Sequence, residues 1–279
     1  MRYKLSAPAT LHTTIQLPAS KSISNRALIL HALAQGHIAP SNLSDCDDTR
    51  VMIKALDGNP GHIDILAAGT AMRFLTAYLS VTPGTRIITG TERMQQRPIR
   101  ILVDALRELG AQIEYAGKEG FPPLRITGTE LTGEEISLAG NVSSQYISAL
   151  LMIGPILKNG LRLNLTGEII SRPYINLTLQ LMKEFGADAA WSSESSITVR
   201  PGKYRDIPFT VESDWSGASY WYQMVALIQD NEKKESTKTE IKLPGLLPRS
   251  YQGDSRGAEI FAKLGVHTTY TDQGVILTK

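Results

Sequence analysis

Cysteine is nearly absent from this sequence of 279 residues, in which Cys46 is the only one. A single cysteine excludes a disulfide within the chain. Three aspartates lie beside it, at Asp45, Asp47 and Asp48, and nearby negative charge opposes the formation of a reactive thiolate. We therefore interpret Cys46 as a small structural residue.

Long apolar runs and an excess of one charge are also missing. No stretch approaches the roughly 20 apolar residues that a membrane-spanning helix needs, and residues 1–8 (MRYKLSAP) lack the apolar core of a secretory signal. The net charge of +2 is too small to favour a nucleic acid or a membrane surface as a partner. We expect a cytoplasmic protein in which any recognition of anions is local.

The sequence does have enough apolar residues, 42% of the total, for one large domain or two of ordinary size. An internal repeat organises them. Short alternating strands that stop at a glycine are predicted at 84–90, 160–167 and 239–245, and their last glycines are 77 and 78 residues apart. After each strand come a basic loop and an amphipathic helix with a glycine just past its end, at Gly110, Gly186 and Gly265.

Another predicted helix precedes each strand and opens at a turn rich in Ser or Thr. The four openings are at 20–24, 68–70, 143–145 and 213–216, and the copy that begins at Ser20 is abbreviated. This pattern predicts an α/β fold of mixed strand direction, built from repeated βαβαββ units whose helices are buried beneath the sheets.

The segment 17–27 (LPASKSISNRA) places Lys21, Ser22 and Arg26 at the start of a predicted helix. Pro18 favours an extended entry, and Ser20 or Ser22 can cap the first turn. Helix amides, a hydroxyl and two cations then converge where a phosphate could bind. The plainer interpretation is a capped surface helix whose basic residues face water.

Four more segments follow in order: 67–73 (AAGTAMR), 91–99 (TERMQQRPI), 141–146 (NVSSQY) and 168–174 (EIISRPY). Together with 17–27 they resemble the 5-enolpyruvylshikimate-3-phosphate synthases, the enolpyruvyl transferases of the shikimate pathway. The resemblance implies two domains of three units each, joined by two chain crossings. Mapped onto this sequence, it predicts one complete domain at residues 20–209 and an incomplete second domain made of residues 1–19 and 210–279.

The resemblance also implies a reaction in aromatic amino acid biosynthesis. The enolpyruvyl group of phosphoenolpyruvate moves to the 5-hydroxyl of shikimate 3-phosphate, with no metal and no organic cofactor. We expect a monomer with these two small-molecule substrates as its partners.

The resemblance implies a role for each matching residue. Shikimate 3-phosphate is assigned to Lys21, Ser22, Arg26, Ser143, Ser144, Gln145, Ser171 and Tyr174. Phosphoenolpyruvate is assigned to Lys21, Gly69, Thr70, Arg97 and Gln145. Lys21 is the expected catalytic residue, since its ammonium can neutralise substrate charge and transfer a proton.

Several of these residues also have a plain structural interpretation. Hydroxyls at a helix start are normally caps, an aromatic residue such as Tyr174 often packs, and a basic loop such as the one around Arg97 often faces water. Asp214, in the segment 213–219 (SDWSGAS), is more readily a helix N-cap than a site residue. Ala67 and Phe74 stand where the family usually has Asn and often has Pro, which leaves inhibitor sensitivity open.

The family's remaining signatures do not occur in this sequence, including the proton-accepting aspartate and the Lys-Glu-(Thr/Ser)-Asp-Arg segment. We therefore expect an N-terminal piece of the enzyme that has no turnover by itself. A naturally short, non-catalytic module that binds shikimate phosphate is the first alternative. The second is a transferase acting on a UDP-amino sugar, although Lys21-Ser22 replaces the usual Lys-Asn and Cys46 is in the wrong segment.

Overall fold

The computed structural model describes residues 11–58, 60–228 and 239–279. The chain forms two compact units. Unit 1 comprises Met1–Ser20 and Glu212–Lys279, and unit 2 comprises Lys21–Val211.

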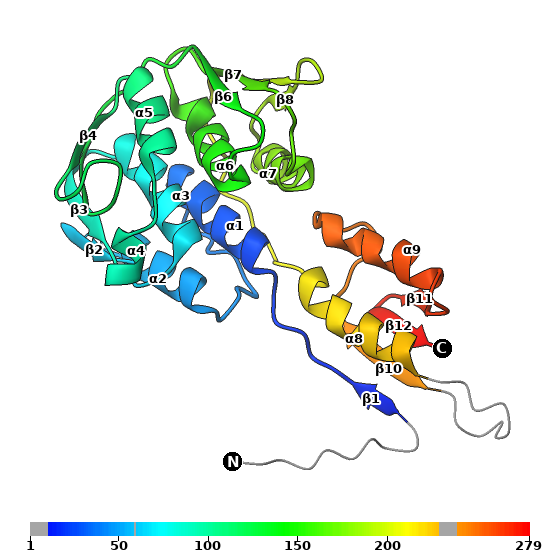
Figure 1. The fold of residues 1–279 in the computed structure, drawn as a ribbon. Helices are drawn as coiled ribbons and strands as arrows, with labels where there is room; N and C mark the ends of the chain where they lie inside the picture. Colours follow the sequence, from blue (N-terminus) through cyan, green and yellow to red (C-terminus); the bar gives the residue numbers. More distant parts are fainter. Residues whose placement is uncertain (1–10, 59, 229–238) are drawn as a thin grey trace, which may run out of the picture. The chain divides into compact units, whose positions relative to one another are not determined.

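Unit 2 contains two four-stranded sheets of the same topology (Figure 1). The first has the order β2 (His62–Asp64), β3 (Gly84–Thr89), β5 (Leu124–Gly128) and β4 (Gln112–Tyr115). The second has the order β6 (Glu135–Ala139), β7 (Leu161–Thr166), β9 (Ser196–Val199) and β8 (Ala189–Trp191). In each sheet the first pair is parallel and the other two pairs are antiparallel.

The helices of unit 2 alternate with these strands. In chain order they are α1 (Lys21–Leu33), α2 (Asp47–Leu56), α3 (Gly69–Ser80), α4 (Glu92–Gln95), α5 (Arg100–Glu108), α6 (Ser144–Ile153), the 3-10 turn η1 (Gly154–Ile156) and α7 (Arg172–Glu184). Around each sheet the chain thus runs in the order β, α, β, α, β, β, as the repeat predicts.

Three helices, α1, α3 and α6, lie inside unit 2. Every residue from Ile23 to Leu30 is buried in α1, and every residue from Tyr146 to Ile153 is buried in α6. Helices that are apolar on most sides are expected in the interior of a protein rather than on its surface. Burial is therefore confirmed for these three helices, and α3 packs against strands β3 and β5.

The amphipathic helices end where the sequence predicts. Gly110 follows α5 with φ +101°, and Gly186 follows α7 with φ +90°. The next amide along the chain then bonds back into the helix, from Ala111 to the Leu106 carbonyl and from Ala187 to the Met182 carbonyl, each at 2.9 Å. Because a positive φ strains any residue with a Cβ, glycine is favoured at this position.

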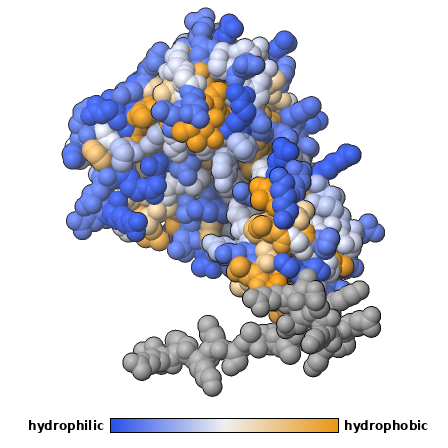
Figure 2. Space-filling model, turned by 45° about the vertical axis from the view of Figure 1, so that its right-hand side comes forward, coloured by the Kyte–Doolittle hydropathy of each residue, from blue (hydrophilic) through white to orange (hydrophobic). Residues whose placement is uncertain are grey.

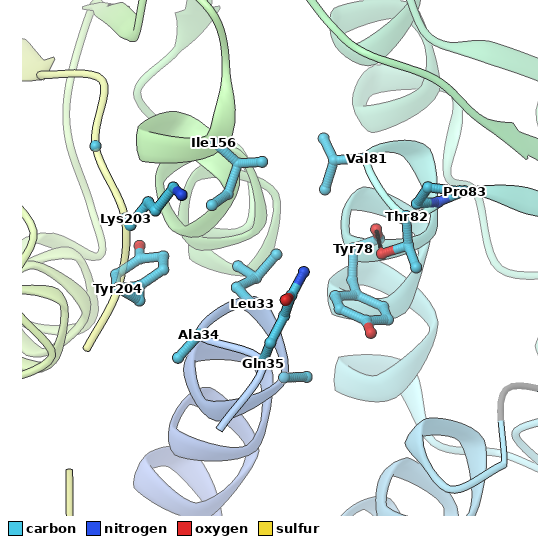
Figure 3. Close-up of a pocket in the computed structure, with 12 residues that line it drawn as sticks. Leu33, Ala34, Gln35, Tyr78, Val81, Thr82, Pro83, Ile156, Lys203 and Tyr204 are labelled. Carbon is cyan, nitrogen blue, oxygen red and sulfur yellow. Dashed lines mark hydrogen bonds between the residues drawn. The ribbon is translucent and has the colours of Figure 1, made fainter. Parts of the chain in front are cut away.

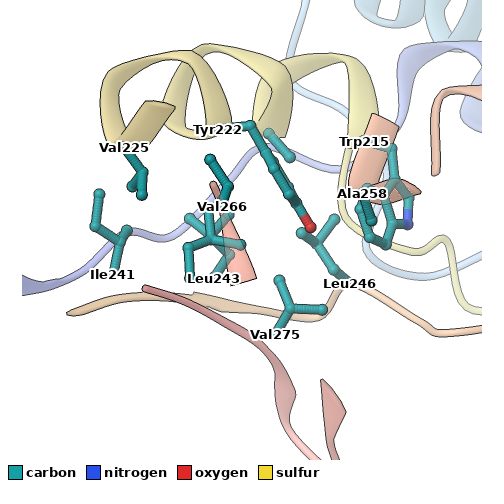
Figure 4. Close-up of a cluster of buried hydrophobic side chains, with 11 residues drawn as sticks. Trp215, Tyr222, Val225, Ile241, Leu243, Leu246, Ala258, Val266 and Val275 are labelled. Carbon is teal, nitrogen blue, oxygen red and sulfur yellow. The ribbon is translucent and has the colours of Figure 1, made fainter. Parts of the chain in front are cut away.

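Unit 1 contains the third sheet, with the order β1 (His12–Thr14), β10 (Glu240–Pro244), β12 (Gly274–Thr278) and β11 (His267–Thr271). Its helices are α8 (Trp215–Leu227), the turn η2 (Gly253–Arg256) and α9 (Gly257–Ala262). Figure 4 shows Tyr222 and Val225 of α8 pointing toward the side chains on β10 and β12, and these residues form one buried apolar cluster.

The opposite side of α8 is apolar and exposed. Tyr220, Met224 and Leu227 are 67%, 50% and 73% exposed, and they are spaced for one helical face. Ile260 of α9 and Leu264 just after it are also more than half exposed. Orange patches interrupt the mostly blue surface of the molecule in Figure 2.

The first copy of the repeat is abbreviated, as predicted. Its helices are α1 and α2, and the segment between them forms a single parallel bridge, from Ser41 to Thr210. The described residues therefore form three mixed four-stranded sheets rather than four. In the same residues no helix is both long enough and apolar enough to cross a membrane.

Candidate anion-binding site

Most of the predicted site residues of unit 2 lie at the starts of four helices. Lys21 is the first residue of α1, Gly69 is the first of α3, and Ser143 and Ser171 are the N-caps of α6 and α7. Free amides at a helix start, together with the partial positive charge of the helix dipole, favour anions.

One chain of contacts joins three of these helix starts. The Lys21 ammonium lies 3.1 Å from Oδ2 of Asp48, in the first turn of α2. Oδ1 of Asp48 accepts a hydrogen bond from the Thr70 amide of α3 at 3.2 Å. The Thr70 hydroxyl in turn accepts from Nε2 of Gln145 at 3.2 Å. Lys21, Thr70 and Gln145, which the sequence places far apart, are therefore brought together.

Arg97 lies against the start of α3. The Gly69 Cα faces the Arg97 guanidinium so closely that an added methyl group would overlap it. Burial and the neighbouring positive charge of Arg73 lower the pKa of Arg97. Gly69 thus leaves room for a cation directly beside the first amides of α3.

A second arginine holds this arrangement in place. Nη1 of Arg73 donates to the Gly69 carbonyl at 2.9 Å, and Nη2 donates to the Pro98 carbonyl at 3.4 Å. The Tyr146 hydroxyl donates to the same Pro98 carbonyl at 2.8 Å. The loop that carries Arg97 is therefore fixed to both α3 and α6.

Arg26 lies in the interior rather than at the helix start. Its guanidinium is buried and donates to the Thr178 hydroxyl (2.7 Å), the Ser148 hydroxyl (2.9 Å) and the Ser22 carbonyl (2.9 Å). Burial lowers the pKa of Arg26 to about 10. In this structure Arg26 ties α1 to α6 and α7 and holds the backbone of Ser22.

The hydroxyl residues are placed at the surface of the helix starts. Ser143 is exposed and its Oγ accepts from the Gln145 amide at 3.3 Å, so it is a helix cap. Ser22, Ser144 and Ser171 are half-buried, and the side chain of Ser171 makes no capping bond. Tyr174 is 39% exposed in the first turn of α7.

Two capping expectations have different outcomes. Ser20 Oγ is buried and makes no hydrogen bond within the described part of the chain, so Ser20, one of the two caps that the sequence offers, does not cap α1. Asp214 of unit 1 is the N-cap of α8, because its carboxylate accepts from the Ser216 amide at 3.3 Å and the Gly217 amide at 3.1 Å. Burial raises the pKa of Asp214 despite these two bonds.

The pocket in Figure 3 lies at the C-terminal ends of α1 and α3, opposite the helix starts that carry the candidate site. Its volume is about 380 Å³, and its walls include Leu33 at the end of α1 and Val81 just after α3. Helix C-termini present carbonyl groups, which do not favour anions. The helix starts are therefore the better candidate site for an anionic ligand.

Sequence reasoning missed three residues of the site, Asp48, Arg73 and Tyr146. Arg73 and Tyr146 belong to the matched segments 67–73 and 141–146, but no role was assigned to them. Asp48 lies outside the five matched segments. Its position in the first turn of a helix is a signal of its own, since acidic residues favour that turn.

Repeated βαβαββ units define an α/β fold in which basic and hydroxyl side chains gather at several helix starts. The chain matches the profile of the family EPSP synthase (3-phosphoshikimate 1-carboxyvinyltransferase) over residues 5–58 and 59–279. It is 71% identical over 279 residues to the 3-phosphoshikimate 1-carboxyvinyltransferase of Bacteroides fragilis strain ATCC 25285, covering 100% of this chain and 66% of that protein. It is 38% identical over 291 residues to the enzyme of the same name from Shewanella halifaxensis, covering 94% of this chain and 66% of that protein.

A solved structure described as EPSP synthase from Acinetobacter baumannii has the same fold, with a TM-score of 0.77 and 20% identity over 96% of this chain and 64% of that chain. This chain belongs to the EPSP synthase family. It spans about two thirds, 66%, of the length of the curated relatives from Bacteroides and Shewanella.

Proposed function

We propose that this chain serves the reaction for which its family is named, the transfer of the enolpyruvyl group of phosphoenolpyruvate to the 5-hydroxyl of shikimate 3-phosphate. The contact chain Lys21–Asp48–Thr70–Gln145 is the observation that supports this most strongly. It gathers a cation, a helix amide and an amide side chain at one place, and two polyanionic substrates need such a place.

The residue roles are part of the proposal. Phosphoenolpyruvate contacts Lys21, Gly69, Thr70, Arg97 and Gln145. Shikimate 3-phosphate contacts Lys21, Ser22, Ser143, Ser144, Gln145, Ser171 and Tyr174, and Arg26 contributes to this substrate's site. The buried position of Arg26 favours a role through the Ser22 backbone.

We also propose that unit 2 is a complete domain, at about residues 20–209, and that unit 1 is an incomplete one. The exposed apolar face of α8 supports the second statement, because an amphipathic helix in a complete domain packs its apolar face against other elements. The proposal extends to a cytoplasmic monomer that uses no metal or organic cofactor.

The 279-residue chain by itself is proposed to have no turnover, since it lacks the family's proton acceptor and its Lys-Glu-(Thr/Ser)-Asp-Arg segment. Loss of a catalytic group that acts as part of a unit commonly removes orders of magnitude of rate. Phosphate release is measured with both substrates, on protein whose mass shows that no longer chain is present. Robust release contradicts this part of the proposal.

Binding of shikimate 3-phosphate to the 279-residue chain tests the site. Calorimetry is expected to show weak binding, which the double variant Ser143→Ala/Ser144→Ala abolishes. The control Thr132→Ala/Ser137→Ala removes two exposed hydroxyls from the same unit and is expected to bind like the unaltered chain. Unchanged affinity in the Ser143/Ser144 variant removes these hydroxyls from the site.

The alternative is a naturally short binding module without catalysis. It predicts the same binding of shikimate 3-phosphate, but it also predicts a native gene product no longer than this chain. The intact mass of that product separates the two, because a native mass near 30.5 kDa favours the module.

A further inference from the structure

Asp48 engages both of its carboxylate oxygens in contacts with the candidate site. Oδ2 forms the ion pair with Lys21 at 3.1 Å, and Oδ1 accepts from the Thr70 amide at 3.2 Å. The side chain is only 17% exposed, whereas that of Lys21 is 46% exposed. Both partners are groups that the proposed function assigns to phosphoenolpyruvate.

The position of Asp48 is that of a ligand anion. Its carboxylate contacts the first turn of α3, where the helix dipole and the backbone amides favour negative charge. Arg97 lies beside the same turn, against Gly69, and Arg73 lies one turn further along α3. The carboxylate therefore offsets part of the positive charge that would otherwise attract any small anion.

We propose that Asp48 is a positioning and specificity residue, an internal anion that holds Lys21 toward α3 and competes with ligand anions for Lys21 and the Thr70 amide. This inference rests on the proposed function for the identity of the substrates, but not for the competition itself. A small anion such as inorganic phosphate has to compete with a carboxylate tethered in place. A substrate with further charges, fixed at further contacts, overcomes that competition more easily.

The substitution Asp48→Asn separates charge from shape. Asparagine keeps an oxygen that can accept from the Thr70 amide, but it removes the negative charge. Two unit charges about 4 Å apart interact by about 1 kcal/mol in water, which corresponds to about fivefold in affinity. Inorganic phosphate is therefore expected to bind about fivefold more tightly at the Thr70 amide in the variant.

The matched control is Asp47→Asn. Asp47 lies in the same first turn of α2 and carries the same charge, but it is exposed. Inorganic phosphate is titrated into 15N-labelled chain, and the resonance of the Thr70 amide gives a local dissociation constant. Asp48→Ser, which also keeps an N-terminal oxygen acceptor, replaces Asp48→Asn if the latter perturbs α2.

Tighter phosphate binding at Thr70 in the Asp48 variant, with no change for Asp47→Asn, supports the inference. Equal or weaker binding in the Asp48 variant overturns it, because a carboxylate that competes for Lys21 and the Thr70 amide has to weaken phosphate binding. Shikimate 3-phosphate is titrated into the same samples by calorimetry. Failure of the unaltered chain to bind it contradicts the proposed function alone, and the phosphate result still decides the role of Asp48.

Discussion

The contact between Gly69 and Arg97 shows how one missing side chain shapes the site. A methyl group at Gly69 overlaps the Arg97 guanidinium, which is on a flexible side chain and can move away. The variant Gly69→Ala is therefore expected to displace Arg97 and to weaken the binding of phosphoenolpyruvate about tenfold, the loss of one charge-assisted contact.

Calorimetry with phosphoenolpyruvate in the presence of shikimate 3-phosphate measures this change. Gly61→Ala is the control, because an added methyl group there meets nothing within 4 Å. Unchanged affinity in Gly69→Ala removes Arg97 from the phosphoenolpyruvate site.

Glu212 of unit 1 gives a pH-dependent prediction. Its Oε1 accepts from the Tyr251 amide at 3.2 Å and Gln252 Nε2 at 3.1 Å, while Oε2 is buried without a partner among the described residues. Burial raises the pKa of Glu212 above its usual 4.5. The folded state therefore holds this proton more tightly than the unfolded chain does, and the contribution to stability falls as the pH rises above about 4.5.

The substitution Glu212→Gln removes this titration and keeps an oxygen acceptor. Relative to the unaltered chain, the variant is expected to become progressively more stable as the pH rises above 4.5, because it carries no group that must lose its proton inside the folded protein. Urea unfolding followed by tryptophan fluorescence, repeated across this range, measures the difference. A stability difference between the two proteins that does not vary with pH contradicts the raised pKa of Glu212.

At the residue scale the sequence predicts which side chains gather, but not how they pair. Lys21, Thr70 and Gln145 could be expected because each lies in a motif at a predicted helix start. Asp48, which links Lys21 to Thr70, could not, since the α2 start meets α3 only through tertiary packing. The same packing takes Arg26 into the interior, where it bonds to residues 122 and 152 positions away.

At the scale of elements, the glycine after α5 gives a clean test of helix termination. Gly110 has φ +101°, and an added methyl group would approach only Leu131, at 4.0 Å. The cost of Gly110→Ala is therefore the strain of the backbone, about 1–2 kcal/mol.

Thermal unfolding of Gly110→Ala measures this loss. In the control Gly202→Ala, from the same unit, the glycine has no such backbone conformation and its added methyl group has open space, so little change is expected. Equal stabilities for the two variants contradict the account of the helix end.

The sequence predicts the helices and strands of this chain better than it predicts their long-range pairing. The period near 77 residues and the glycines past each helix predict the alternation of strands and helices, because both signals are local. The strand order within each sheet, and the pairing of β1 with β10 from the other end of the chain, depend on long-range contacts that a local pattern does not contain.

At the scale of the whole molecule, unit 2 is expected to fold independently. It contains two complete sheets and the three buried helices α1, α3 and α6. Limited proteolysis is predicted to leave a resistant core of about residues 20–209, identified by mass. Early cleavage spread evenly through residues 80–200 contradicts this prediction.

The central claim is that anionic substrates bind at the starts of α1, α3 and α6. The most direct test is titration of the 15N-labelled chain with shikimate 3-phosphate, followed amide by amide in NMR spectra. We predict that the amides which move most are those of Ser22, Thr70, Ser144 and Gln145. Changes confined to Leu33, Val81 and Lys203, which line the pocket at the other helix ends, would contradict the claim.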